Sequence, residues 1–334
     1  MKLETAQFLR SPTTGAKLEV EPFTLAGNEI LEGRLIETAS GVWYRIEDGI
    51  ADLTLAQYRN TDRHAAFCKR HGLDQNLLSA APVKPDPNAS KQIKFFSTYQ
   101  DGYEADVVQS PFYDVLNRVT IARWLPDNVK KGAMVAEVGC GSGHQTLHII
   151  RQGGNVVGVD LSEEMLRHAR RRVQGEACPG HADFVVGTAE NLPLGDMLFD
   201  AAAIFGGLHH FSDPPTALLR LSKALKARGK VFLLEPHNSP VRFVFDCMMR
   251  RWPLWQEEAN DAPLFEASQL REFLKASGID CSIRYSTFLP PHLFYFLKPS
   301  YGHFLLSATD GLLGSVPGIR LCAGVIIAEG TKAP

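Results

Sequence analysis

The order of hydrophobic and polar positions changes in character near residue 95. Before residue 57 the chain contains short alternating runs, such as 17–20 and 42–46, separated by turn residues such as Asp48-Gly49. Alternation of apolar and polar residues is typical of half-buried strands. The pattern therefore predicts a small β-rich unit over residues 1–57.

A polar stretch follows over residues 58–94 and includes three prolines between positions 82 and 87. Each proline fixes φ and removes a backbone hydrogen-bond donor. This composition predicts a linker or irregular surface segment.

From residue 95 onward, strand and helix patterns alternate. Ser110-Pro111 is typical of a helix start, and apolar residues recur at helical spacing through Leu125. The runs predicted as strands lie at 134–138, 156–159, 184–186, 201–205, 230–234, 281–288 and 324–328. Helical patterns separate the first of these runs, which predicts an α/β domain over 95–334, with a mostly parallel sheet and helices on both faces.

Composition narrows the class of protein. The chain has 334 residues, more than one core usually organises, with 45% hydrophobic and 22% charged residues. A formal net charge of −2 gives no electrostatic reason to expect nucleic acid. The six cysteines form no CxxC pair, and the apolar stretches 288–297 and 321–328 are too short to span a bilayer. We therefore expect a cytoplasmic protein with no membrane span.

A glycine-rich turn follows the first strand of the α/β domain. Gly139, Gly141 and Gly143 give the pattern G-x-G-x-G, whereas a dinucleotide fingerprint would need its third glycine at His144. Asp160 ends the next strand, where an acidic side chain can bind ribose hydroxyls. Taken singly, the glycines could be ordinary turn residues and Asp160 could be a cap. Together they predict a nucleotide-type cofactor site.

Several segments resemble the class I S-adenosylmethionine-dependent methyltransferases of the small-molecule type. Residues 137–143 match their first motif, 157–166 their second strand and helix, 187–193 their adenine-binding segment, and 208–211 the loop after the fourth strand. The resemblance covers about 95–334. It implies S-adenosyl-L-methionine as cofactor and a Rossmann-like sheet of seven strands, of which the last is antiparallel. The cofactor-binding residues that it implies are Glu137, Gly139, Cys140, Gly141, Gly143, Asp160, Leu161, Met165, Thr188, Ala189, Glu190 and Phe205.

Proton removal from an acceptor points to histidine. His209 and His210 follow the fourth strand and are the candidate catalytic residues, although they could instead shape the site. Glu235, with His237 close by, is a second candidate base. The arginines between 167 and 172 are predicted to form a solvated helix face, not an RNA-binding patch.

Aromatic residues are frequent in 236–278 and 288–320. In the family that the chain resembles, inserts in these places cap the acceptor, so we expect a hydrophobic or aromatic small-molecule acceptor. The alternative is that these aromatic residues belong to the core.

Residues 11–53 resemble a zinc-ribbon-like domain that accompanies many methyltransferases. The positions that would carry its cysteine ligands hold Ser11, Thr14, Glu37 and Ser40. Hydroxyl groups are poor zinc ligands, so we expect no metal. The unit is expected either to pack on the enzyme or to mediate homodimerisation.

These observations lead to a functional hypothesis. We expect a methyltransferase that acts on a hydroxyl or amine of a hydrophobic small molecule in natural-product biosynthesis. An RNA methyltransferase is the first alternative, because related zinc domains accompany RNA enzymes. A non-catalytic S-adenosylmethionine-binding scaffold is the second.

Overall fold

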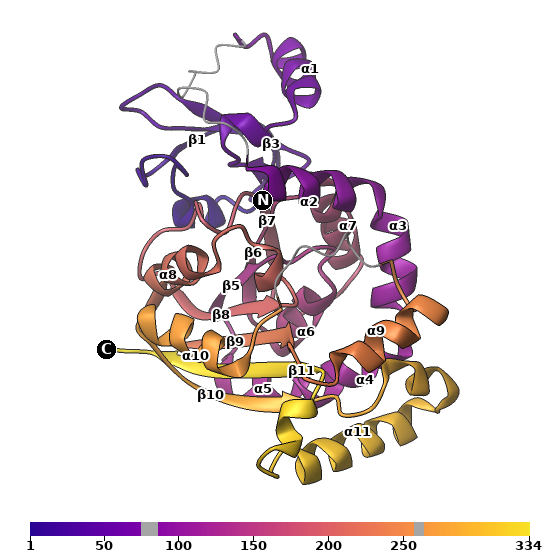
Figure 1. The fold of residues 1–334 in the computed structure, drawn as a ribbon. Coiled ribbons are helices and arrows are strands. Elements are labelled where there is room, and N and C mark those ends of the chain that lie inside the picture. The colour runs from indigo at the N-terminus through magenta and orange to yellow at the C-terminus, as the bar shows by residue number, and fades with distance from the viewer. Residues whose placement is uncertain (75–85, 257–263) are drawn as a thin grey trace.

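The computed structural model describes residues 1–74, 86–256 and 264–334, and in these residues eleven strands form one sheet in the order β1-β2-β3-β4-β7-β6-β5-β8-β9-β11-β10 (Figure 1). The last seven strands in this order are β7 (Ala182–Val186), β6 (Asn155–Asp160), β5 (Met134–Val138), β8 (Phe199–Phe205), β9 (Leu225–Pro236), β11 (Val325–Lys332) and β10 (Ile279–Ser286). The pairs from β7 through β9 are parallel, and β11 is antiparallel to both its neighbours. The predicted seven-stranded sheet with an antiparallel last strand is confirmed.

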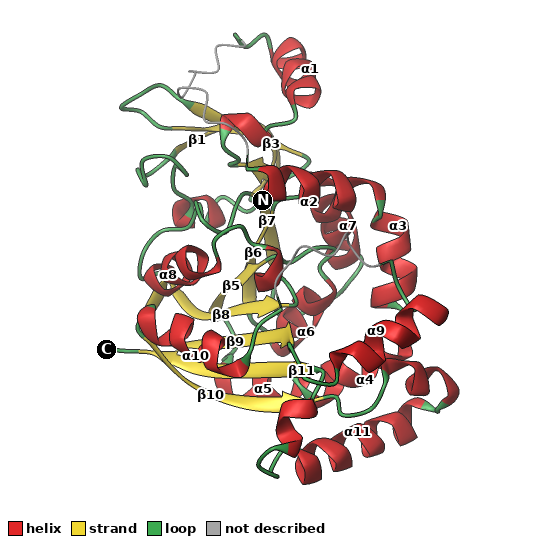
Figure 2. Cartoon of the chain, viewed as in Figure 1, coloured by secondary structure: helices red, strands yellow, loops and turns green. Residues whose placement is uncertain are grey.

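Helices cover both faces of the sheet (Figure 2). One face carries α4 (Pro111–Val119), α5 (Ile121–Asn128), α6 (His144–Gln152) and α7 (Glu163–Gln174), and the other carries α8 (Pro214–Ala224) and α10 (Ala267–Ala276). Successive strand residues enter opposite cores: Val135 packs with the α4–α6 side and Ala136 with the α8 and α10 side. This alternation is the period-two geometry of a strand that is buried on both faces.

The helix predicted to begin at Ser110-Pro111 is divided between α4 and α5 at Thr120. The Thr120 backbone leaves the helical region, with φ −114° and ψ −89°, and its hydroxyl donates to the Leu116 carbonyl oxygen at 2.7 Å. A side-chain hydroxyl that bonds to the preceding turn in this way often bends a helix.

The first 57 residues form an antiparallel meander that continues the main sheet. Its strands are β1 (Glu19–Ala26), β2 (Glu29–Ile36), β3 (Trp43–Glu47) and β4 (Ile50–Asp52). Strand β4 pairs in parallel with β7, with Ile50 opposite Phe184 and Ala51 opposite Val185. The predicted β-rich unit is therefore present, and its last strand belongs to the same sheet as the α/β domain.

An ion-pair network joins the meander to α7. The Arg45 side chain, 1% exposed, contacts the carboxylates of Asp52, Glu47 and Glu163, of which Glu163 begins α7. Arg167 of α7 contacts Glu47 and Glu163 in turn. The predicted solvated arginine face is wrong for Arg167 and likewise for its neighbour at position 170, because carboxylates of the meander cover both of them.

The four positions that correspond to zinc ligands occupy two similar turns, at Ser11, Thr14, Glu37 and Ser40. The carbonyl oxygen of Ser11 accepts from Gly15 N at 2.9 Å, and that of Glu37 accepts from Gly41 N at 2.8 Å. Both glycines have positive φ, +74° and +72°. The Thr14 hydroxyl donates to Glu37 Oε1 at 3.0 Å and so joins the two turns directly. In the described residues no group of three or more His, Cys, Asp or Glu side chains could hold a metal ion.

The segment 58–94 differs from its prediction. It contains α1 (Thr61–His71) and most of α2 (Pro87–Thr98), so the expectation of an irregular segment is wrong for these residues, while 75–85 lies outside the described residues. Asp86 caps α2 by accepting from Asn88 N at 2.7 Å, and Pro87 stands at the first helical position. The remaining elements are η1 (Thr5–Phe8), η2 (Ala56–Tyr58), α3 (Gln100–Tyr103), η3 (Glu104–Val108), η4 (Leu208–His210), α9 (Arg242–Arg251), η5 (Pro291–Phe296), α11 (Pro299–Leu313) and η6 (Ile319–Cys322).

No helix in the described parts of the chain has the length and apolar character needed to cross a bilayer.

Candidate active site

A cavity of about 430 Å³ lies at the carboxyl ends of the parallel strands. Residues at or just beyond the ends of four strands line it, among them Gly139 after β5, Asp160 at the end of β6, Gly187 after β7 and Phe205 at the end of β8. Open α/β sheets bind ligands at this edge, because the loops diverge there and leave a crevice.

The glycine turn after β5 and the carboxylate of Asp160 are bonded together. Gly141 N donates to Asp160 Oδ2 at 2.8 Å, and Ser162 N donates to Asp160 Oδ1 at 2.9 Å. Burial raises the pKa of Asp160, while these backbone donors and the nearby His210 act in the opposite direction. The carboxylate is thus held rigidly in the wall of the cavity.

Two glycines in this turn have a specific physical requirement. Gly139 has φ +70°, a conformation that other residues rarely adopt, and its backbone lines the cavity. Gly143 has φ +73° and caps α6, and a Cβ added there would lie 2.8 Å from the Ala169 Cβ. The turn therefore needs glycine both for its conformation and for close packing against α7.

Most of the predicted cofactor-binding residues line the cavity: Gly139, Gly141, Asp160, Leu161, Met165, Thr188, Ala189, Glu190 and Phe205. Cys140 does not, because its side chain packs in the core with Leu166 and Phe184. Burial in that core raises the pKa of the Cys140 thiol. The structure therefore gives no support to a direct side-chain contact of Cys140 with a cofactor.

Glu137 also lies behind the cavity wall. It is 1% exposed and accepts a hydrogen bond from the Thr146 hydroxyl at 2.6 Å through Oε2. Its Oε1 atom is buried and has no hydrogen-bond partner in the described residues. Burial raises the pKa of Glu137 to about 8.

The opposite wall comes from residues that the sequence did not indicate. The loop after β4 contributes Leu55 and the neighbouring residues Gln57 and Tyr58, and α2 contributes Gln92 and Phe96. The α2 residues 89, 92, 93 and 96 line the cavity at helical spacing. This spacing predicts a helix, but the prolines between positions 82 and 87 favoured the prediction of a linker.

Helix α2 is also bonded to the histidine loop. The side-chain amide of Asn88 donates to the His210 carbonyl oxygen at 3.0 Å, and the Phe96 and His210 rings lie 6.0 Å apart. Helix α2 thus covers the side of the cavity where the candidate catalytic residues lie.

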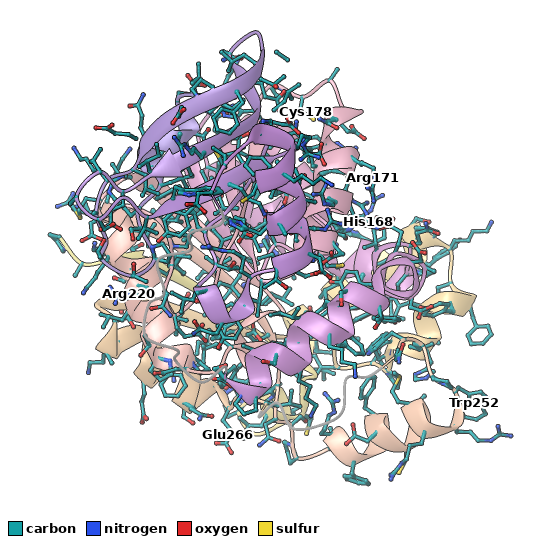
Figure 3. The ribbon with its side chains drawn as sticks, turned by 90° about the horizontal axis from the view of Figure 1, so that it is seen from above. His168, Arg171, Cys178, Arg220, Trp252 and Glu266 are labelled. Carbon is teal, nitrogen blue, oxygen red and sulfur yellow. The ribbon has the colours of Figure 1, made fainter. Side chains whose placement is uncertain are left out.

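The predicted cap over the acceptor is not found in this cavity. None of the described residues in 236–278 or 288–320 lines it, and residues 257–263 lie outside the described parts. Trp255 instead packs on Tyr113 of α4, with ring centroids 5.7 Å apart, and Trp252 lies at the periphery of the molecule (Figure 3). These aromatic segments extend around the outside of α4, so α2 and the loop after β4 form the cover.

The two candidate histidines differ in position. His210 lines the cavity and His209 does not. The Nδ1 atom of His209 lies 2.8 Å from Glu235 Oε2, and Oε1 of the same buried carboxylate accepts from Gly207 N and Leu208 N at 3.1 and 2.9 Å. Glu235 therefore holds η4 in place and is not in contact with the cavity, which argues against its role as a base.

His237 does not line the cavity either, so it is not placed to act as a base there. It is buried, and its Nδ1 lies 2.8 Å from the Ala323 carbonyl oxygen. Burial lowers its pKa. Among the histidines that the sequence suggested as bases, only His210 lines this cavity.

The sheet order, the glycine turn and the acidic strand end define an α/β enzyme of the nucleotide-cofactor class. Comparison with known proteins narrows this class. The profile of the methyltransferase domain family matches residues 136–233. The demethylmenaquinone methyltransferase of Lactobacillus johnsonii is 27% identical over 196 residues, which cover 51% of this chain and 80% of that protein. The ubiquinone/menaquinone biosynthesis C-methyltransferase UbiE of Psychromonas ingrahamii is 30% identical over 172 residues, which cover 45% of this chain and 68% of that protein.

Among solved structures, the [4+2]-cyclase SpnF aligns with a TM-score of 0.51 and 18% identity, covering 75% of this chain and 98% of that chain. At this identity the likeness concerns the fold. The chain belongs to the class I S-adenosylmethionine-dependent methyltransferases, and S-adenosylmethionine is its cofactor.

Proposed function

We propose that the enzyme transfers the methyl group of S-adenosylmethionine to a hydroxyl or amine of a hydrophobic small molecule in natural-product biosynthesis. The observation that carries the proposal is the composition of the cavity. The glycine turn and Asp160 line the cavity, and so do the aromatic side chains Phe96, Tyr103 and Phe211 and the side chain of His210. Polar groups suited to the cofactor and apolar groups suited to an acceptor thus line the same cavity.

The donor set fits the cofactor. Asp160 offers a carboxylate for the ribose hydroxyls, and we assign the adenine ring to Thr188, Ala189 and Glu190, which line the same cavity. When bound, S-adenosylmethionine supplies an activated methyl group on a sulfonium.

The protein's own contribution is position and proton removal. Phe96 and Phe211 would hold an apolar acceptor and exclude water. His210 would take the hydroxyl or amine proton, while the His209–Glu235 contact fixes the loop that carries it. The acceptor oxygen or nitrogen gains the methyl group, its proton leaves to His210, and S-adenosylhomocysteine is the second product.

Incubation of the purified enzyme with isotope-labelled S-adenosylmethionine and a panel of hydrophobic phenols, hydroquinones and arylamines tests the proposal. Methylated phenol or arylamine, detected by mass spectrometry and dependent on His210, supports it. Binding of the cofactor without transfer to any member would favour a non-catalytic scaffold. Transfer to RNA, with salt-dependent RNA binding, would favour the RNA alternative.

Methylation at carbon is a second candidate, because one similar protein is named a ubiquinone/menaquinone biosynthesis C-methyltransferase and another a demethylmenaquinone methyltransferase. Deprotonation of a hydroquinone spreads negative charge over oxygen and ring carbons, so the same base serves either product. A ¹³C-labelled methyl group distinguishes them, because its chemical shift on oxygen differs from that on carbon. A carbon-bound methyl group with no oxygen- or nitrogen-bound product would replace the first proposal by the second.

A further inference from the structure

Exposed apolar side chains are concentrated on one side of the molecule. Of the seventeen large hydrophobic residues that are exposed in the described chain, thirteen lie between 241 and 321, including every exposed aromatic one. The most exposed are Phe296 at 87%, Phe304 at 71% and Leu312 at 70%. Isolated exposed hydrophobic residues are ordinary, but a concentration of this kind indicates an interaction surface.

Helix α11 has an apolar outer face. Gly302 and Leu306 are buried, and the close approach of Gly302 to Val115 packs the helix on α4. Tyr301 and Phe304 point to the other side and are 64% and 71% exposed. The only acidic residue in the helix, at position 310, bonds to Ser286 and Thr287 of the body of the protein. The outer face therefore lacks the charged residues that solvent-facing helices usually carry.

Helix α9 and the turn η5 continue this face. His292 Nε2 of η5 lies 2.7 Å from the Trp252 carbonyl oxygen, and the His292 and Phe245 rings are 6.4 Å apart. Phe294 is buried against Phe112, which leaves its neighbour Phe296 directed outward. Figure 1 shows α9, α4 and α11 on the same side of the molecule. We call the outer surface of α9, η5 and α11 the aromatic face.

Most of the exposed charged side chains on the described part of the aromatic face are basic. Arg250 and Arg251 end α9, and Lys298 precedes α11. The acidic residue Asp246 of α9, whose side chain is 42% exposed, accepts a hydrogen bond from Arg242 at 2.6 Å, so an arginine on the same helix balances its charge. Aromatic side chains interleaved with arginine and lysine match the interface of an anionic membrane, where rings enter the boundary of the acyl chains and cations meet phosphates.

We propose that the aromatic face binds the surface of an anionic phospholipid membrane. With 15 residues, α11 is too short to span a bilayer and would lie in the interface. A second copy of the chain fits less well, because a two-fold contact would bring the same basic residues of both copies together. The proposal does not depend on which acceptor is methylated.

Co-sedimentation of the purified chain with lipid vesicles tests this proposal. We expect binding to vesicles of phosphatidylcholine mixed with phosphatidylglycerol, and about tenfold weaker binding to phosphatidylcholine alone. Trp252, which is 58% exposed, gives a second signal, because its fluorescence should shift to shorter wavelength on insertion and the shift should vanish in Trp252→Phe.

Matched variants separate the aromatic face from the rest of the surface. Phe296→Ser with Phe304→Ser should reduce binding at least about tenfold. The control variant, Leu25→Ser with Leu219→Ser, removes exposed apolar residues outside the aromatic face and should bind as wild type does. Unchanged melting temperature and cofactor affinity in both variants show intact folding, because none of these residues lines the cavity.

Three results would overturn the proposal: no binding to either vesicle type, equal loss in the control variant, or a dimer that the two phenylalanine substitutions dissociate without any vesicle binding. The last result would assign the aromatic face to a second copy.

Discussion

Arg45 provides the sharpest test of how the N-terminal meander is attached to the methyltransferase sheet. Its side chain is 1% exposed and contacts Asp52, Glu47 and Glu163, whose side chains are 4%, 13% and 9% exposed. Arg45→Met keeps most of the volume but leaves these buried carboxylates without their shared cation. Breaking a buried ion pair by removing one partner costs about 3–5 kcal/mol.

The matched control is Arg70→Met. Arg70 also contacts Glu47, but its side chain is 46% exposed, so water screens the pair. Such surface pairs contribute about 0–1 kcal/mol. Both variants remove a guanidinium group from Glu47. Arg45 is buried and also contacts Asp52 and Glu163, whereas Arg70 is half-exposed and also contacts Glu32.

Urea unfolding, followed by circular dichroism at neutral pH, measures both variants. We expect Arg45→Met to lose at least about 3 kcal/mol of unfolding free energy and Arg70→Met less than about 1 kcal/mol. Because Glu163 begins α7, and Met165 of α7 lines the cavity, Arg45→Met should also weaken cofactor binding. Equal losses in the two variants would refute the reasoning, since burial would then not decide the contribution.

Three further predictions concern the cavity. Burial raises the pKa of Glu137 from 4.5 to about 8, so the wild-type protein loses stability as the pH rises from 4.5 toward 8 and the buried carboxyl group must ionise. Glu137→Gln keeps a neutral side chain at every pH. In urea unfolding without cofactor, its unfolding free energy should exceed that of wild type by up to roughly 5 kcal/mol above pH 8 and should equal it near pH 4. Gln92→Leu removes a buried amide oxygen that has no hydrogen-bond partner in the described residues, so it should raise the melting temperature. Because Gln92 lines the cavity, the same substitution should weaken ligand binding severalfold. The control variant Lys91→Leu, on the exposed side of α2, should not weaken binding. His210→Ala should lower turnover about 10²-fold or more and leave cofactor affinity unchanged. His209→Ala disturbs the loop that Glu235 holds, so it should change turnover and cofactor affinity together. Normal turnover in the two variants would exclude a histidine base.

The part of the site that the sequence predicted is the part encoded locally. The strand, the glycine turn and Asp160 lie within a short stretch, so their spacing alone indicates the carboxyl edge of a sheet. The pairing of β4 with β7 joins residues 50–52 to 184–186, and no local pattern reveals such a contact. For the same reason the loop after β4, with Tyr58, was not expected in the cavity.

Two expected features do not line the cavity, and each has a particular physical cause. Cys140 follows a strand end in the cofactor motif, but only the packing of Leu166 and Phe184 shows that its side chain turns inward. The aromatic residues after β9 were expected to cover the acceptor because they are apolar. When apolar residues occur on more than one face of a helix, hydrophobicity alone does not show which face is buried. Helix α11 is such a helix, because Leu306 is buried while Tyr301 and Phe304 are exposed to solvent.

The central claim is that this cavity binds S-adenosylmethionine through Asp160 and the glycine turn. Calorimetric titration of the purified protein with S-adenosylmethionine, S-adenosylhomocysteine and NAD, with Asp160→Ala as control, tests it most directly. We predict that both sulfur compounds bind, that NAD does not, and that the substitution weakens binding at least about tenfold, because a ribose hydroxyl loses its charged acceptor. Absence of binding by the sulfur compounds, or equal affinity in Asp160→Ala, would contradict the account.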